Sequence, residues 1–181
     1  MTFKIEQIHH VAYRCHDAKE TVEWYQKNLH MDFILAFAEN QVPSTKEPDP
    51  YMHIFLDAGN ANVLAFFELP TRPKMGSDTN TPVWVQHIAL RVKDRDTLLA
   101  AKTHLEDNGV DVLGITDHGL FHSIYFFDPN GHRIELAYDD PDAPNKIAQI
   151  TDELKYDMLN EWAATKRAPS HTQFLHAQEF E

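Results

Sequence analysis

The sequence predicts an α+β fold in which one small unit, a strand followed by a helix and three more strands, occurs twice. Three observations support this prediction. Two stretches of the chain repeat a short residue pattern, short segments alternate apolar and polar residues, and an apolar stripe with helical spacing follows the first strand of each copy. We expect the first unit at residues 5–69, a linker at 70–82, the second unit at 83–138, and a C-terminal helix and tail at 139–181.

The composition is that of an ordinary globular protein, with 43% hydrophobic residues in a chain of 181. A formal net charge of -12 argues against nucleic acid and anionic membrane surfaces as partners, because both are negatively charged. No apolar run reaches the roughly 18 residues that span a bilayer, the first residues lack a signal-peptide pattern, and the single Cys15 excludes an intrachain disulfide. We therefore expect a cytoplasmic protein that binds a small molecule.

The repeat is clearest where each copy begins. The segments QIHHVAYRCHD and VWVQHIALRVKD both contain His-x-Ala-x-Arg, starting at His10 and His87. Both copies also end on Glu-Leu, at Glu68 and Glu135, so we align these two glutamates. The match indicates an internal duplication.

In the first copy, the alternation in IHHVAYR predicts a strand. Asp17 and Glu20 then predict the N-terminal cap of a helix, with apolar residues following at Val22 and Tyr25. MHIFLDAG and NVLAFFEL indicate two of the three later strands, and the Pro, Ser and Asn content of residues 38–50 predicts a loop before them.

In the second copy, QHIALRV predicts a strand, Asp94 opens a helix, and VDVLGIT, SIYFFD and HRIELAY indicate three strands. The DPNG segment predicts a hairpin turn in which Asp128 faces His132. Counting outward from this turn pairs Tyr125 with Glu135. Beyond the second copy, an apolar stripe predicts a further helix at about 146–165, which packs on the outside of a sheet or covers a site.

Strand parity predicts the direction of each side chain. It places Tyr125, Arg133 and Glu135 on one face of the second copy, opposite an apolar face that packs against the helix. A buried carboxylate is costly unless a partner compensates its charge, and a metal ion often does so. The same parity, with the alignment above, directs His10 and His87 toward the same cavity. Two histidines and a carboxylate suit a divalent transition metal, commonly Fe(II).

These residues resemble the vicinal oxygen chelate superfamily, which includes glyoxalase I, extradiol ring-cleaving dioxygenases, methylmalonyl-CoA epimerase and bleomycin-resistance proteins. The DPNGHRIEL segment and the two first-strand histidines carry the resemblance, which covers about residues 5–138. It implies a pair of βαβββ modules that form an open, cup-shaped barrel around a metal, and a homodimer.

The resemblance also implies which residues bind the metal. It points to His10, His87 and Glu135 as ligands, with Glu68 as a fourth ligand or as a carboxylate at the rim. Fe(II) is the expected ion, with Ni, Zn or Mn as alternatives.

Further residues match positions around the metal in this superfamily. Tyr125 has the spacing to the last-strand ligand that the active-site tyrosine of extradiol dioxygenases has, and His122 is the candidate acid-base catalyst beside it. Arg14 matches an arginine that helps to hold glutathione in glyoxalase I. We expect Arg14, His53 and Phe66 to contact the substrate. The aromatic rings among them suit a planar apolar molecule.

Three functions follow from the resemblance. The first is an Fe(II) extradiol dioxygenase-like oxidoreductase that acts on a small aromatic diol. The alternative is a glyoxalase-like lyase or isomerase, or a related epimerase, in which Glu68 and Glu135 both bind Ni or Zn. The third is a ligand-binding protein without catalysis, similar to bleomycin-resistance proteins.

Overall fold

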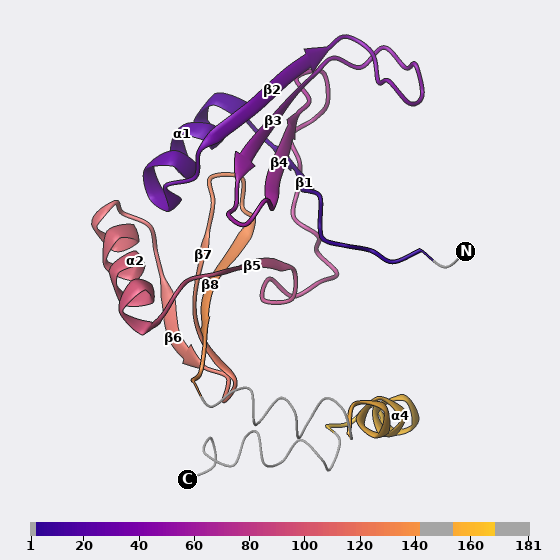
Figure 1. Ribbon diagram of the computed structural model, residues 1–181. Coiled ribbons are helices and arrows are strands. Elements are labelled where there is room, and N and C mark those ends of the chain that lie inside the picture. Colours follow the sequence, from indigo (N-terminus) through magenta and orange to yellow (C-terminus); the bar gives the residue numbers. More distant parts are fainter. Residues whose placement is uncertain (1–2, 142–153, 169–181) are drawn as a thin grey trace.

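A computed structural model of the protein describes residues 3–141 and 154–168. It contains two four-stranded sheets, with a helix packed against one face of each (Figure 1). The elements in chain order are β1 (Val11–Cys15), α1 (Ala18–Leu29), β2 (Phe33–Glu39), β3 (Tyr51–Asp57), β4 (Val63–Glu68), β5 (His87–Arg91), α2 (Arg95–Asp107), β6 (Leu113–Asp117), β7 (Phe121–Phe127), β8 (Arg133–Asp139) and α4 (Lys155–Thr165).

The two sheets have the same topology, which confirms the predicted α+β fold of two βαβββ modules. Their strand orders are β1-β4-β3-β2 and β5-β8-β7-β6, and in each sheet the first strand runs parallel to the last. We expected three strands after the helix of the first copy but located only two of them in the sequence. β2 is the third. All seven of its residues are exposed, and the segment FILAFAE does not alternate apolar and polar residues. β2 also extends to Glu39, into the region where we expected a loop.

Both helices begin at the predicted caps. The Asp17 carboxylate accepts a hydrogen bond from the backbone N–H of Glu20 at 2.8 Å, and the Asp94 carboxylate accepts one from Thr97 at 2.9 Å. These bonds pair backbone donors that the first turn of a helix leaves free. Each helix then lays its apolar stripe on its own sheet, where Tyr25 of α1 is fully buried.

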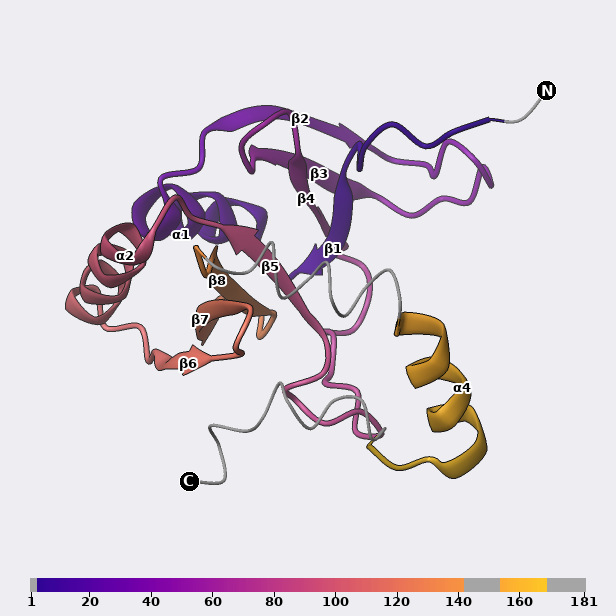
Figure 2. The same cartoon turned by 60° about the horizontal axis from the view of Figure 1, so that its bottom comes forward.

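The hydrophobic core is shared by the two modules. Tyr25 and Phe66 of the first module belong to the same buried cluster as Leu98 and Phe126 of the second. Trp24 lies next to Phe126, with ring centroids 6.2 Å apart. The modules therefore pack against each other through their helix-covered faces, and α1 lies beside α2 in both views (Figures 1 and 2).

The predicted hairpin turn between β7 and β8 holds this junction together. The Asp128 N–H donates to the His132 carbonyl at 3.0 Å, and Gly131 has a φ of 85°, which glycine adopts without strain. The Asp128 carboxylate is buried, and it accepts hydrogen bonds from the Tyr25 hydroxyl at 3.1 Å and from the His132 N–H at 2.8 Å. We call residues 128–132 the junction turn.

Other residues of the junction turn extend its contacts to the first module. The Asn130 amide accepts from the His16 N–H at 2.8 Å and donates to the Thr21 hydroxyl at 3.2 Å. The His132 ring lies 4.8 Å from the Tyr13 ring, and its Nε2 is 2.7 Å from the Arg14 carbonyl oxygen. A short turn of the second module is thus bonded to both β1 and α1 of the first.

The C-terminal helix lies apart from this core. α4 covers Lys155–Thr165 and contains no buried residue, so the packing predicted from its apolar stripe is not seen (Figure 2). Residues 146–153 of the predicted helix lie outside the described residues. Within the described part of the chain, no helix is both long enough and apolar enough to cross a membrane.

Replacing Tyr25 with Phe removes the hydroxyl that the buried Asp128 carboxylate accepts from. Because hydrogen bonds to charged groups contribute more than neutral ones, we expect Tyr25→Phe to lower the free energy of unfolding by about 1.5 kcal/mol. Urea denaturation measures the change. Tyr156→Phe is the matched control, because Tyr156 is 69% exposed and should change stability little. Equal stability of the two variants would show that the junction turn does not depend on this bond.

Candidate functional site

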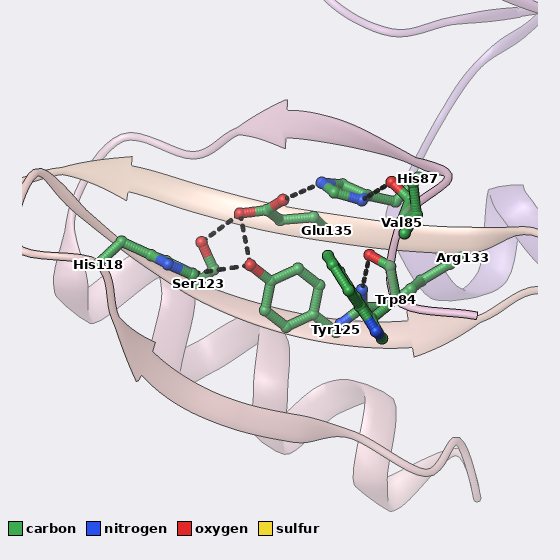
Figure 3. Close-up of polar contacts among 8 residues, drawn as sticks. All are labelled: Trp84, Val85, His87, His118, Ser123, Tyr125, Arg133 and Glu135. Atoms are coloured by element: carbon green, nitrogen blue, oxygen red, sulfur yellow. Dashed lines mark hydrogen bonds and ion pairs between the residues drawn. The ribbon is translucent and has the colours of Figure 1, made fainter. Parts of the chain in front are cut away.

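A histidine-carboxylate pair lies on the face of the second sheet that the helices leave uncovered. β5 runs parallel to β8, with His87 opposite Arg133 and Ala89 opposite Glu135. His87 is two residues from Ala89, so its side chain lies on the same face of the sheet as that of Glu135. His87 Nε2 lies 2.9 Å from Glu135 Oε2 (Figure 3). Glu135 is only 3% exposed, although it lies in an otherwise apolar strand. Its carboxylate faces polar partners, while the side chains of its neighbours Ile134 and Leu136 enter the core.

Neighbouring groups hold both members of the pair. His87 Nδ1 lies 3.1 Å from the Val85 carbonyl oxygen, which can accept its proton. Glu135 Oε1 accepts hydrogen bonds from the Ser123 hydroxyl and from the Tyr125 hydroxyl, the latter at 3.1 Å. His87 Nε2 and Glu135 Oε2 therefore remain directed at each other. One imidazole nitrogen and one carboxylate oxygen, each oriented by a second hydrogen bond, fit two ligands of a divalent transition metal.

The Tyr125 hydroxyl is placed between two partners. It donates to Glu135, and His118 Nε2 lies 2.8 Å from its oxygen (Figure 3). Burial raises the pKa of Tyr125, and the nearby negative charge of Glu135 raises it further. The hydroxyl therefore keeps its proton at neutral pH and acts as a hydrogen-bond donor on this face.

Arg133 adds a positive charge beside the pair. Its guanidinium carbon lies 4.1 Å from the centre of the Tyr125 ring, and one of its N–H groups donates to the Trp84 carbonyl at 2.5 Å. Tyr125 and Arg133 line a cavity of about 730 Å³ together with Leu113 and Phe127. This volume is in the range of small-molecule sites, and the apolar part of its wall suits a planar ring, while Glu106 and Asp111 also line it.

The first module directs His10 and Arg14 to its own uncovered face, because the alternate residues Val11, Tyr13 and Cys15 pack against the core. His53 of β3 lies on the same face, because its neighbour Ile54 is in the core. The His10 and His53 rings lie 6.4 Å apart, while an Arg14 N–H donates to the Pro73 carbonyl at 2.5 Å.

The His53 ring stacks on Phe67 with centroids 3.6 Å apart, and its buried Nε2 has no hydrogen-bond partner among the described residues. Burial lowers the pKa of His53, and His10 lowers it further. The His53 ring is therefore neutral near pH 7.

The predicted direction of Phe66 and Glu68 is wrong. Phe66 is fully buried in the core beside Tyr25, and Glu68 Oε2 accepts a hydrogen bond from the Ala18 N–H at the start of α1. Both side chains thus lie on the helix-covered face.

The register explains the error. In β4, Ala65 lies opposite Ala12 as Glu135 lies opposite Ala89, so Ala65 is the structural counterpart of Glu135. The repeated Glu-Leu letters do not occupy equivalent positions in the two sheets.

His122 also lies away from the position that we predicted. Its ring stacks on Tyr138, and its Nδ1 lies 3.8 Å from Asp117 Oδ1. His122 therefore lies on the other face of β7 from Tyr125. The histidine that reaches Tyr125 is His118, which the sequence patterns did not single out. A detectable signal was the turn at HGLF, where the His118 N–H donates to the Phe121 carbonyl and Gly119 has a φ of 72°. That pairing places His118 on the face of Tyr125.

Within residues 3–141 and 154–168, the chain brings together His87 and Glu135 but not His10. No group of three or more His, Cys, Asp or Glu side chains in these ranges is close enough to hold a metal ion. The contacts of the His10 ring are with His9, His53 and Phe55. One chain therefore presents two of the three expected ligands on the second module and the third on the first module.

Comparisons with known proteins agree with this architecture. The sequence pattern of the Glyoxalase/Bleomycin resistance protein/Dioxygenase superfamily matches residues 7–136, and the chain belongs to this superfamily. MhqA of Bacillus subtilis (strain 168), a candidate ring-cleaving dioxygenase, is 29% identical over 140 residues, which cover 76% of this chain and 42% of that protein. The chain thus spans less than half of the length of this relative.

Solved structures show the same fold at low sequence identity. Glyoxalase I of Leishmania major matches with a TM-score of 0.56 and 19% identity, covering 87% of this chain and 98% of that one. A domain of the superfamily from Frankia sp. EAN1pec matches with a TM-score of 0.58 and 15% identity, covering 76% and 100%. The antibiotic-binding protein TnmS3 from Streptomyces sp. CB03234 matches with a TM-score of 0.53 and 19% identity, covering 77% and 100%. The fold therefore hosts enzymes and binding proteins alike.

The contact between Tyr125 and Glu135 has a consequence for pH titration. Glu135→Gln removes the negative charge that opposes ionisation of the Tyr125 hydroxyl, so the raised pKa of Tyr125 should fall toward its ordinary value near 10. An NMR titration of metal-free protein with ¹³C-labelled tyrosine rings measures this pKa. Glu68→Gln is the matched control, because Glu68 lies on the helix-covered face of the other sheet. If Glu135→Gln left the Tyr125 pKa unchanged, the contact would not be electrostatically significant.

Proposed function

We propose that the protein is an Fe(II)-dependent ring-cleaving dioxygenase that acts on a small aromatic diol. The observation that carries this proposal is the His87–Glu135 pair, in which the buried carboxylate of Glu135 places Oε2 2.9 Å from His87 Nε2, while its other oxygen accepts from the Tyr125 hydroxyl. The similarity to a candidate ring-cleaving dioxygenase supports it. Superfamily membership makes metal-assisted chemistry on a small molecule the general expectation.

The chain's own residues define how such a substrate would be handled. Fe(II), when bound by His87 and Glu135, supplies Lewis acidity and redox chemistry with dioxygen. Tyr125 holds a proton beside this position and can donate a hydrogen bond to a substrate oxygen. His118 contacts the same hydroxyl at 2.8 Å, so it can pass a proton to Tyr125 or take one from it. Leu113 and Phe127 offer apolar surface to the ring of the substrate.

The glyoxalase-like alternative loses support from the geometry of the first module. That mechanism needs a second carboxylate at the metal, but the position equivalent to Glu135 is Ala65, and Glu68 binds the start of α1. The non-catalytic alternative is less favoured because the His87–Glu135 pair is retained with its supporting hydrogen bonds.

We further propose that the protein acts as a homodimer in which a second copy supplies His10 to the His87–Glu135 pair. The shared core joins the modules through their helix-covered faces, so the faces that carry the ligands remain uncovered in a single chain. Both faces also expose large apolar residues, including Phe37 at 42% on β2 and Leu113 at 65% on β6. Apolar surface of this kind typically marks an interaction site, and pairing of a first module with a second module from another copy would bury it.

Metal binding separates the proposed ligands from Glu68. We expect His10→Ala, His87→Ala and Glu135→Gln each to lower the iron content of anaerobically purified protein by at least about tenfold, because each removes a ligand. Glu68→Gln should retain iron, since its side chain can still accept a hydrogen bond from the Ala18 N–H. Elemental analysis by mass spectrometry gives the metal content. Loss of iron in Glu68→Gln alone would return Glu68 to the ligand set.

The two-chain site predicts complementation between inactive variants. A heterodimer of His10→Ala and His87→Ala contains one site in which both ligands are mutated and another in which both are intact. Mixing the two variants after mild unfolding should therefore restore up to about half of the activity per heterodimer, measured as oxygen uptake with an aromatic diol. Mixing His87→Ala with Glu135→Gln is the matched control, because both changes affect the second module and the intact combination cannot form. Equal recovery in the two mixtures would contradict a site shared between copies.

A further inference from the structure

A second cavity lies on the helix-covered side of the molecule, where the C-terminal end of α1 meets α2. It has a volume of about 610 Å³, which is in the range of small-molecule sites. Its floor is apolar and includes Met31 of the first module and Leu90, Ala101 and Leu136 of the second. Leu90 and Leu136 belong to β5 and β8, so this cavity is separated by the sheet from the face that carries His87 and Glu135.

Asn28, one of the residues that line this cavity, has a side-chain oxygen without a hydrogen-bond partner among the described residues. Asn28 is 5% exposed, and its amide nitrogen donates to the Trp24 carbonyl at 3.0 Å, which fixes the orientation of the amide. Asn28 Oδ1 is buried and has no hydrogen-bond partner among the described residues. An unpaired buried acceptor costs free energy, and a ligand that donates a hydrogen bond would remove this cost.

The remaining polar groups limit the charge of such a ligand. The carboxylates of Asp32 and Asp57 line the cavity, and the guanidinium of Arg91 is already paired with Asp139 at 2.8 Å. An anionic ligand would therefore meet two carboxylates, while the guanidinium in the lining is held by Asp139.

Two imidazole rings complete the wall of the cavity. The His30 and His104 rings lie 4.8 Å apart, so they offer aromatic surface to a planar ring. His104 Nε2 is 2.9 Å from the Lys27 carbonyl oxygen, which leaves it directed at the backbone and away from a ligand.

We propose that this cavity is a second small-molecule site, which takes an uncharged molecule of the phenol class: an apolar ring that carries one O–H donor. The ring lies against Leu90, Ala101 and the two imidazoles, and the O–H donates to Asn28 Oδ1. This inference does not depend on the metal or on the dioxygenase activity, because it uses the opposite face of the sheet.

The test follows the imidazole ring protons of His30 and His104 by NMR while the full-length protein is titrated with phenol, anisole or benzoate. Phenol should shift these signals saturably. Anisole, which has the ring but no donor, should bind about tenfold more weakly, as expected for the loss of one hydrogen bond. Benzoate should not bind. Equal affinities of phenol and anisole would overturn the proposal, because Asn28 would not be the anchor.

Four variants localise the binding. Ala101→Phe fills the cavity from α2 and should abolish the phenol-induced shifts, whereas Ala163→Phe on the exposed face of α4 should retain them. Asn28→Leu keeps a similar volume without the acceptor and should make phenol and anisole bind equally. His87→Ala should bind phenol like the wild type. Phenol shifts that persist in Ala101→Phe would contradict the site, and if that variant does not fold, a phenol preference that persists in Asn28→Leu would do so.

Discussion

The buried carboxylate of Asp128 determines how the two halves of this protein are joined. It accepts hydrogen bonds from the Tyr25 hydroxyl of one module and from the backbone N–H groups of Asn130 and His132 in its own turn. A carboxylate that is 5% exposed is stable only when donors surround it, so the turn and α1 have to meet in one arrangement. The shared apolar core then lies between the helix-covered faces.

This arrangement has a direct effect on the site. Because the helices occupy the junction, the sheet faces with His10 and with His87 and Glu135 are both left outside the core. Each module thus carries part of the proposed ligand set with its neighbouring polar groups, and exposed apolar side chains on β2 and β6 border those groups. The helix-covered face of each sheet therefore stabilises the single chain, and the uncovered face carries the residues of the proposed metal site.

The sequence predicted the second module's site more accurately than the first module's. The DPNG turn fixed a local register, and counting from it paired Tyr125 with Glu135, as observed. The first module also has a hairpin turn before β4, at residues 58–62, but the two copies were aligned on the letters Glu-Leu and not on their turns. That alignment placed Glu68 three residues away from the true counterpart, Ala65. His122 was the candidate acid-base residue beside Tyr125, but strand parity turns it to the other face, and His118 is the histidine that reaches the Tyr125 hydroxyl.

The two helix caps and the hairpin could be predicted from the sequence because they depend on interactions between residues close together in the chain. The duplication and the α+β class could be predicted because their residue patterns repeat along the chain. The folded chain was needed to reveal the pairing of β1 with β4, the docking of the second module's turn on α1, and the separation of His10 from the His87–Glu135 pair. Those features depend on contacts between distant segments. A repeated residue pattern identifies the strands that take part, but the packing of the core selects the face that each side chain occupies.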